Sequence, residues 1–317
     1  MQSSSVSLWP VGLQCKLYAS NDVPSICNHA AHGGIESAKD KHFAMNQSSA
    51  VSQRALLIGS GSHLGGAVLA AEGDGLSIDA VSHSVGLESL NLDEYNVVVN
   101  MGYDPRYMRE PYVQELDFDL AVAKRVAQSS THYVMISTRR VYGQPMPFKI
   151  DEDCVPQPQD HYGRNKYRTE QQVHELLGPR YTIVRVANVF GFEPGRHTFF
   201  GIALDSLKRN NKIVLDVSPF VRRDFIYIDD FARTLRRVLT LRPEGLFNLG
   251  SGESTAIGHV ALWMIEGYGK GDLVVTSPVE RDEFELNIDK LVRAIGPMES
   301  SVTIRERCNK IGERLSE

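Results

Sequence analysis

The residues Ala55-Leu-Leu-Ile-Gly-Ser-Gly-Ser-His-Leu-Gly-Gly66 run directly into Ala67-Val-Leu-Ala-Ala71. The first four form an apolar run of the length of a buried strand, and the last five favour a helix. The glycines between them permit a tight turn and a close approach of the backbone at the start of that helix. The stretch therefore predicts a strand, a glycine turn and a helix, in that order.

The same alternation continues toward the C-terminus. Further strands are predicted at 76–82, 97–99, 132–137, 181–186, 225–228 and 246–249, and helices at 116–129, 162–177, 198–209 and 229–241. Most strand runs are apolar throughout, which is typical of strands buried on both faces of a parallel sheet. We predict an α/β fold, a doubly wound parallel sheet with a smaller C-terminal lobe.

Residues 1–52 differ from the rest of the chain. They are rich in Ser, Asn and His, lack a sustained period, and contain neither a long apolar run nor an arginine. We interpret them as a flexible N-terminal extension, with Met45 as an alternative start of the folded unit. Residues 53–192 are predicted to form a nucleotide-binding domain to which 222–255 return, and 193–221 with 256–317 to form a substrate lobe.

Composition narrows the function further. The chain has 317 residues, 42% of them hydrophobic and 23% charged, with a formal net charge of −5. This composition is typical of a soluble globular protein. The negative net charge argues against a nucleic-acid partner. The lack of a stretch of about 18–20 apolar residues argues against a membrane span. The cysteines and histidines show no metal-ligand or disulfide spacing, so we expect no metal site, free thiols and a cytoplasmic location; the cysteines are Cys15, Cys27, Cys154 and Cys308.

The glycine turn is a candidate cofactor site. A dinucleotide pyrophosphate binds where free N–H groups and the helix dipole meet at a helix N-terminus. The candidate residues are Gly59, Gly61, Ser62, His63, Leu64 and Gly65. By itself the turn is weak evidence, because any tight connection between a strand and a helix favours glycine.

The second predicted strand ends in Ser82-His83-Ser84, without the carboxylate that would bind the adenine ribose of NAD. Asp79 lies inside the strand and is expected to point elsewhere. We therefore expect NADP as the cofactor, with NAD as the alternative, and His83 as a contact. The alternative interpretation is a surface turn that contacts no cofactor.

The segment Tyr162-Gly-Arg-Asn-Lys166 is the candidate catalytic segment. Four residues along a helix place both side chains on one face. A neighbouring ammonium lowers the pKa of a phenol, which is near 10 in the free residue, and so suits it to proton transfer. The strand that ends at Thr138 brings a hydroxyl to the same end of the sheet. Thr138, Tyr162 and Lys166 are the candidate catalytic residues, and Lys166 is also a candidate cofactor-binding residue that holds the nicotinamide ribose.

Six segments in order resemble the extended short-chain dehydrogenase/reductase family, in its nucleotide-sugar epimerase and reductase branch, which has a Rossmann-type fold. They are Leu57–Gly65, Ser137–Gly143, Tyr162–Lys166, Arg185–Gly191, Arg223–Asp229 and Phe247–Gly252. The middle glycine of the family's turn is Ser62 here, and the stretch before Val97 is shorter than usual. The resemblance implies an NAD(P)-dependent oxidoreductase that acts on a nucleotide sugar, and leaves a homodimer open.

The resemblance also implies substrate-binding roles. Asn188 corresponds to an asparagine that faces the sugar nucleotide, and Arg223 to an arginine that holds the diphosphate, with Arg281 as a second candidate. Arg139 and Arg140 stand where related 4,6-dehydratases carry Asp-Glu, the acid and base of water elimination. We therefore expect a 4-keto sugar reductase, with an NAD-dependent 4-epimerase as the alternative. A catalytically silent NAD(P)-sensing regulator is a third reading.

Overall fold

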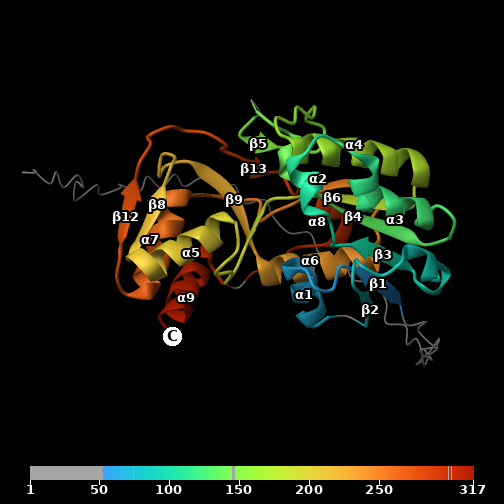
Figure 1. Ribbon diagram of the computed structural model, residues 1–317, viewed down its shortest axis with the longest axis horizontal. Coiled ribbons are helices and arrows are strands. Elements are labelled where there is room, and N and C mark those ends of the chain that lie inside the picture. The colour runs from blue at the N-terminus through green and yellow to red at the C-terminus, as the bar shows by residue number, and fades with distance from the viewer. Residues whose placement is uncertain (1–52, 74, 145–146, 299, 301) are drawn as a thin grey trace, which may run out of the picture. The chain divides into compact units, whose positions relative to one another are not determined.

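Six parallel strands form the central sheet of the computed structural model, which describes residues 53–73, 75–144, 147–298, 300 and 302–317. Their spatial order is β10-β6-β4-β3-β1-β2, and every neighbouring pair is parallel (Figure 1). The strands are β1 (Arg54–Ile58), β2 (Ser77–Val81), β3 (Val97–Asn100), β4 (His132–Thr138), β6 (Tyr181–Val186) and β10 (Gly245–Leu249). The predicted α/β class is confirmed. The predicted extension, residues 1–52, lies outside the described residues.

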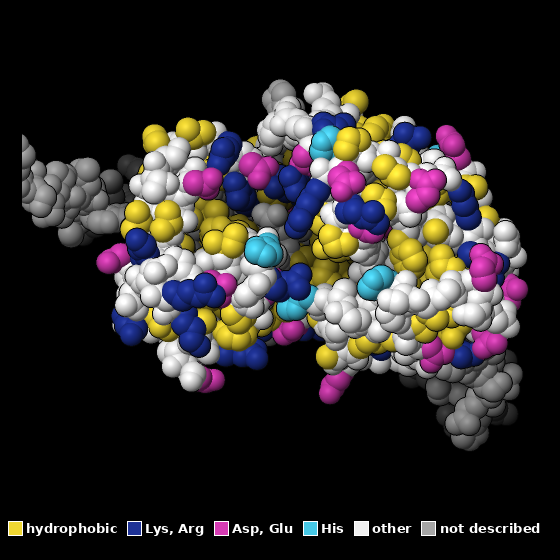
Figure 2. Space-filling model, in the orientation of Figure 1, with side chains coloured by type: hydrophobic (Ala, Val, Ile, Leu, Met, Phe, Trp, Pro, Cys, Tyr) yellow, Lys and Arg dark blue, Asp and Glu magenta, His cyan; other side chains and the backbone are white. Residues whose placement is uncertain are grey.

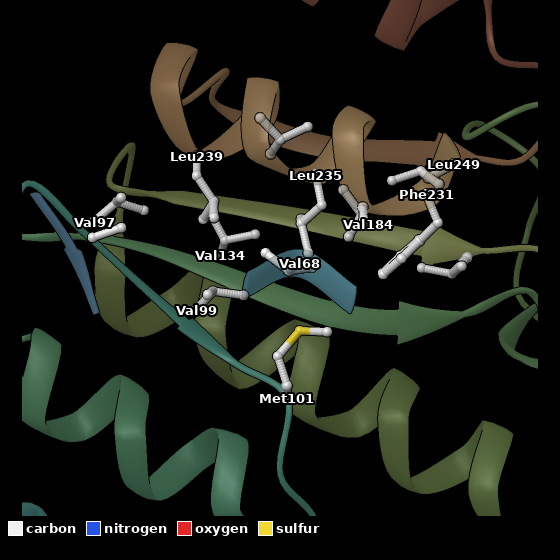
Figure 3. Close-up of a cluster of buried hydrophobic side chains, with 14 of the residues drawn as sticks. Val68, Val97, Val99, Met101, Val134, Val184, Phe231, Leu235, Leu239 and Leu249 are labelled. Atoms are coloured by element: carbon white, nitrogen blue, oxygen red, sulfur yellow. The ribbon is translucent and has the colours of Figure 1, made fainter. Parts of the chain in front are cut away.

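Helices cover both faces of this sheet. Successive strand residues point to opposite sides, and because both sets are apolar, each face must be buried. Leu57 packs in a core with Val68 of α1 and Leu235 of α6, whereas Leu56 packs in a second core with Val122 of α3. Figure 3 shows the first of these cores, with α6 lying over the strands. The first face carries α1 (His63–Ala70), α6 (Ile228–Leu241) and α8 (Asp289–Ile295). The second carries α3 (Phe118–Val126) and α4 (His161–Leu177), with the short α2 (Pro105–Arg109) packed on α4.

A separate core lies among the elements that follow β6. Phe200, Leu204 and Met264 are buried together there, away from the six-stranded sheet. The helices are α5 (Phe199–Asn210), α7 (Ile257–Tyr268) and α9 (Ile304–Ser316). The strands are β8 (Lys212–Leu215) paired with β12 (Asp272–Val275), and β7 (Asn188–Phe190), β9 (Arg222–Tyr227) and β11 (Ser254–Ala256) in a three-stranded sheet. The residue boundaries predicted for the two domains stay a proposal.

The stretch between β2 and β3 is short, as the sequence indicates. Within the described residues it holds two 3₁₀ turns, Leu87–Ser89 and Leu92–Glu94, and β2 is the edge strand. The predicted strand and helix positions otherwise agree with the structure within a few residues. The small strands β5 (Lys149–Ile150), β7, β8, β11, β12 and β13 (Glu285–Leu286) were not predicted. None of the described helices is long and apolar enough to span a membrane.

Candidate active site

The glycine turn connects β1 to α1 and approaches the end of β3 closely. Gly59 has a φ of +96°, and a Cβ at this position would lie 2.6 Å from the Gly102 nitrogen. Either fact alone would strain any other residue. Ser62 caps α1 by accepting a hydrogen bond from the Gly65 N–H at 3.0 Å. The conformation of the turn is therefore fixed by its contact with Gly102 and by the Ser62 cap of α1.

The space in front of this turn fits a pyrophosphate. A Cβ on Gly61 would meet no atom within 4 Å, so the backbone faces open space there. The N–H groups of His63 and Leu64 belong to the first turn of α1, where an α-helix has no carbonyl partners for them. Burial and the nearby Arg196 lower the pKa of His63. The residues present thus fit the phosphates of NAD(P), with free N–H groups at a positive helix end.

The end of β2 carries no acid that faces this turn. The Asp79 carboxylate accepts a hydrogen bond from Arg54 at 2.6 Å, so it points away as predicted. The Val81 carbonyl accepts from the Gly59 and Ser60 N–H groups. His83 is exposed, and its Cβ lies against Gly102. These contacts place His83 next to the glycine turn without deciding between NAD and NADP.

Helix α4 presents Tyr162 and Lys166 near the carboxyl end of the central strand β4. Asp160 caps the helix by accepting from the Gly163 N–H at 2.8 Å. A Cβ on Gly163 would lie 2.5 Å from the Arg140 carbonyl oxygen, so this glycine lets α4 approach the chain that leaves β4. The Lys166 ammonium is buried and donates to the Ile136 carbonyl of β4 at 2.8 Å and to Asp119 Oδ2 at 2.6 Å.

The ionisation of Tyr162 differs from the sequence prediction. Burial raises the pKa of Tyr162, the Lys166 ammonium lowers it, and the carboxylate of Asp119 raises it again. The net direction is upward, so the predicted lowering by Lys166 is present but does not dominate. The physical reason is that burial of the phenol outweighs the lysine charge, part of which Asp119 also offsets.

The two hydroxyls that end β4 face different surroundings. Ser137 donates a short hydrogen bond to Glu170, which is buried and paired with Arg185 at 2.6 Å. Thr138 Oγ1 accepts from the Arg140 N–H at 3.3 Å. The Arg140 guanidinium in turn lies 6.0 Å from the centre of the Tyr162 ring. Ser137 is thus part of the buried support, whereas Thr138 caps the turn that carries Arg140, and its contact with the substrate oxygen stays a prediction.

Arg139 and Arg140 are both engaged in ion pairs. Arg139 forms a bidentate ion pair with Asp282, and its guanidinium carbon lies 4.1 Å from the centre of the Phe284 ring. Arg140 pairs with Asp160 at 2.5 Å. The guanidiniums stay protonated at neutral pH and cannot serve as acid and base. Neither can replace the Asp-Glu pair that related dehydratases carry at these positions.

Three arginines form what we call the arginine cluster: Arg139 and Arg223 pair with Asp282, and Arg281 precedes Asp282 in the chain. Arg223 donates to the Asp282 carbonyl at 3.1 Å, and its guanidinium lies 3.6 Å from the Asp282 carboxylate. Arg281 pairs with Asp216 at 2.6 Å. Burial lowers the pKa of Arg223, and the charges of Arg139 and Arg281 lower it further while Asp282 raises it. Basic side chains border the hollow near the middle of Figure 2.

Asn188 begins β7 and pairs with Phe225 of β9. Arg223 also lies on β9, so the three-stranded sheet carries two of the predicted substrate residues. Sequence reasoning missed Asp119 and Asp282, which face the predicted cations. The only signal for Asp119 is its position in the first turn of a predicted helix, after Asp117. In the described residues, Cys154 and Cys308 are free and no group of ligands could hold a metal ion.

Residues 90–250, just over half of the chain, match the model of the NAD dependent epimerase/dehydratase family. A dTDP-L-rhamnose 4-epimerase of Burkholderia thailandensis is 33% identical over 135 residues, which are 39% of this chain and 36% of that protein. Mouse dTDP-D-glucose 4,6-dehydratase is 26% identical over 138 residues, 42% of this chain and 39% of that protein. The matched segments span between 36% and 51% of the length of the first curated relatives.

Solved structures share the fold over nearly their whole length. RMD from Pseudomonas aeruginosa, solved with NADPH, has a TM-score of 0.69 at 22% identity, with 83% of this chain and 99% of that chain covered. UDP-glucose 4-epimerase of Thermotoga maritima, solved with UDP-glucose, has a TM-score of 0.67 at 21% identity, with 82% and 98% covered.

Proposed function

The chain belongs to the NAD dependent epimerase/dehydratase family, and from this premise we propose that it interconverts a hydroxyl and a keto group on the sugar of a nucleotide sugar. The observation that carries the proposal is the position of Tyr162 and Lys166. Both lie on α4, and the Lys166 ammonium is fixed to the last residues of β4. In doubly wound sheets the ligand site forms outside the carboxyl ends of the strands.

Each residue then has a defined task. Bound NAD(P) supplies the hydride acceptor and donor at this site. Tyr162 takes the proton from the sugar hydroxyl or returns it to the keto oxygen, and Thr138 holds the same oxygen by a hydrogen bond. Lys166 stabilises the phenolate form of Tyr162 by its charge, which is the lowering contribution to the pKa of that phenol. Asn188 contacts the sugar nucleotide from β7.

The arginine cluster suits the diphosphate of the substrate. The planar fork of an arginine donates pairs of hydrogen bonds to phosphate oxygens. The Arg223 guanidinium donates to the Arg281 carbonyl at 3.5 Å, and the charge of Arg281 lowers the pKa of Arg223. We assign these two side chains to the diphosphate and add Arg139, because it shares Asp282 with Arg223.

Among reactions at the sugar, we propose 4-epimerisation. The family description and the relative at 33% identity support it, and the arginines at the dehydratase positions count against elimination. A 4-keto sugar reductase, which the sequence alone favoured, is the second candidate. It rests on Ser82-His83-Ser84, whose lack of an acid favours NADP, a cofactor that reductases consume. The silent regulator is disfavoured because Tyr162 is retained.

The test is product analysis with purified protein, NAD or NADPH, and UDP- and dTDP-linked hexoses and 4-keto hexoses. An epimerase yields an isomer of equal mass without net change in the nicotinamide. A reductase consumes NADPH and a 4-keto sugar, and a dehydratase yields a product lighter by one water. Tyr162→Phe removes turnover, while Tyr167→Phe on the same helix serves as the matched control. The proposal is overturned if no nucleotide sugar reacts, or if the Tyr162→Phe variant keeps wild-type turnover.

Three further expectations remain proposals. The cofactor is NADP, or NAD if the enzyme is a 4-epimerase, two copies of the chain pair as a homodimer, and the protein works in the cytoplasm. Size-exclusion chromatography with light scattering measures the second of these. An elution as a monomer at micromolar concentration would contradict it.

A further inference from the structure

Asp119 is a buried carboxylate at the start of α3 that the proposed reaction does not use. One oxygen, Oδ2, accepts the Lys166 ammonium at 2.6 Å. The other, Oδ1, accepts from Asn100 Nδ2 at 2.8 Å and from the Tyr133 hydroxyl at 2.6 Å. Only 5% of the Asp119 side chain and 7% of the Lys166 side chain are exposed. Each oxygen of the carboxylate therefore has a protein partner inside the fold.

The same network reaches the glycine turn. Asn100, at the end of β3, donates to the Gly102 carbonyl at 3.0 Å and accepts from the Gly102 N–H at 2.9 Å. Gly102 is the residue against which Gly59 packs. Asp119 thus connects Lys166, through a single asparagine, to the backbone that shapes the candidate phosphate site.

The hydrogen-bond count at Lys166 leaves one donor. An ammonium carries three N–H groups. One points to Asp119 Oδ2 and one to the Ile136 carbonyl. Two fixed bonds determine the direction of the third, which stays available to a bound group. A lysine held in this way loses little further freedom when the ligand binds.

We infer that Asp119 is a positioning residue. It fixes the Lys166 ammonium so that the remaining N–H of Lys166 is directed at the bound nucleotide, and it links this ammonium to the glycine turn. The inference rests on the proposed function only for the identity of that nucleotide. Asp119 touches neither substrate nor cofactor and acts through Lys166. Because both groups are buried, removing one leaves the other as an uncompensated charge.

The matched pair of variants is Asp119→Asn and Asp117→Asn. Both carboxylates are buried at the start of α3. Asp119 lies in the first turn, and Asp117 caps the helix by accepting from Leu120 while it also accepts from Thr169 and Tyr112. Asparagine keeps the shape and caps helices well, so each change removes one charge. Only Asp119 is bonded to Lys166.

The primary readout is the titration of Lys166 in the protein without nucleotide, followed by the ¹³Cε resonance of labelled lysine and assigned with Lys166→Met. Burial lowers the pKa of Lys166, and Asp119 and Tyr162 more than reverse this. In Asp119→Asn the burial effect remains while the contribution of Asp119 is lost, so the midpoint falls below that of the wild-type protein. Asp117→Asn lowers the midpoint less, because Asp117 raises the pKa of Lys166 more weakly and is not bonded to it. The titratable groups around this ammonium are Asp117, Asp119, Tyr107, Tyr133 and Tyr162.

A second readout is nucleotide affinity, measured by fluorescence titration with NADH and NADPH. Asp119→Asn weakens binding about tenfold or more, the size of one charge-assisted hydrogen bond, and Asp117→Asn changes it little. If Asp119→Asn folds poorly, the double variant Asp119→Asn with Lys166→Met regains thermal stability, because no buried charge is left alone. Failure of the double variant to regain it would contradict the pairing.

The inference and the proposed function fail differently. A protein that converts no nucleotide sugar, but whose Lys166 midpoint drops further in Asp119→Asn than in Asp117→Asn, overturns only the proposed function. Unchanged Lys166 titration in Asp119→Asn, or an equal drop in both variants, overturns the inference even when the enzyme is active.

Discussion

The α4 ion pairs and the arginine cluster hold their cations in different ways. In the first region Lys166 pairs with Asp119 and Arg185 pairs with Glu170, each at 2.6 Å and with 3–7% of the side chains exposed. In the cluster the ion pairs of three arginines involve two carboxylates, Asp282 and Asp216. Arg139 and Arg223 are 14% and 15% exposed, whereas Arg281 is 58% exposed.

The difference separates support from recognition. A buried cation with its own carboxylate is close to neutral as a pair, so it holds a side chain in place and acts on an adjacent group such as Tyr162 without attracting a diphosphate. A cluster with more guanidiniums than carboxylates keeps excess positive charge, which is the condition for binding a diphosphate. Changes beside α4 should therefore alter turnover, and changes in the cluster should alter substrate affinity.

The largest expected effect is at Tyr162. Tyr162→Phe removes the transferable proton and leaves the ring in place, so kcat falls on the order of 10²-fold or more while nucleotide affinity stays within a few-fold. Steady-state kinetics and fluorescence titration measure the two quantities. Loss of nucleotide affinity without loss of kcat would reverse the roles that we give to the two regions.

A buried group without a carboxylate partner gives the second effect. His132 starts β4, its ring shares a hydrogen bond with Thr182, and burial together with Arg242 and Arg180 lowers the pKa of His132 to about 4. The fold binds the neutral ring, so this stability is complete above about pH 6.5 and is lost as the pH falls toward 4.

His132→Gln removes that titration while keeping a polar side chain. Between about pH 6.5 and pH 4 the wild-type protein should lose up to about 3 kcal/mol more unfolding free energy than the variant. Urea unfolding across this range measures it. Parallel stability curves for the two proteins would show that folding does not lower the pKa of His132.

The third effect is in the arginine cluster. Arg223→Met removes a guanidinium but keeps much of the apolar stem, so KM for the nucleotide sugar should rise about tenfold with a smaller change in kcat. Arg233→Met is the matched control, because Arg233 pairs with Asp230 on α6 outside the cluster. If both variants shift KM equally, the cluster has no special role in binding the diphosphate.

The smallest effect concerns the choice of cofactor. Ser82→Asp places a carboxylate at the exposed end of β2 and should weaken NADPH relative to NADH by about two- to fivefold, the size of an exposed charge interaction. Titration of wild type and variant with both nucleotides measures this ratio. An unchanged ratio would place the adenine ribose away from Ser82.

The sequence predicted the sheet better than the site. Apolar runs such as Val97-Val-Val99 and the helical spacing from Tyr162 to Lys166 are local signals, and the structure agrees with both. The three-residue strand β7 has no such signal, because it depends on pairing with β9. The contact of Lys166 with Asp119 joins residues 47 positions apart on two helices, so the local pattern could not reveal that the lysine charge is offset.

Hydride transfer governed by Tyr162 is the central claim, and rapid mixing of the protein and NAD(P) with a nucleotide sugar tests it most directly. We predict that wild type shows the absorbance band of reduced nicotinamide appear with a nucleotide hexose, or disappear with a 4-keto sugar. Tyr162→Phe should bind the same sugar and show neither change. An equal absorbance change in the variant, or no change in wild type with any nucleotide sugar, would contradict the account.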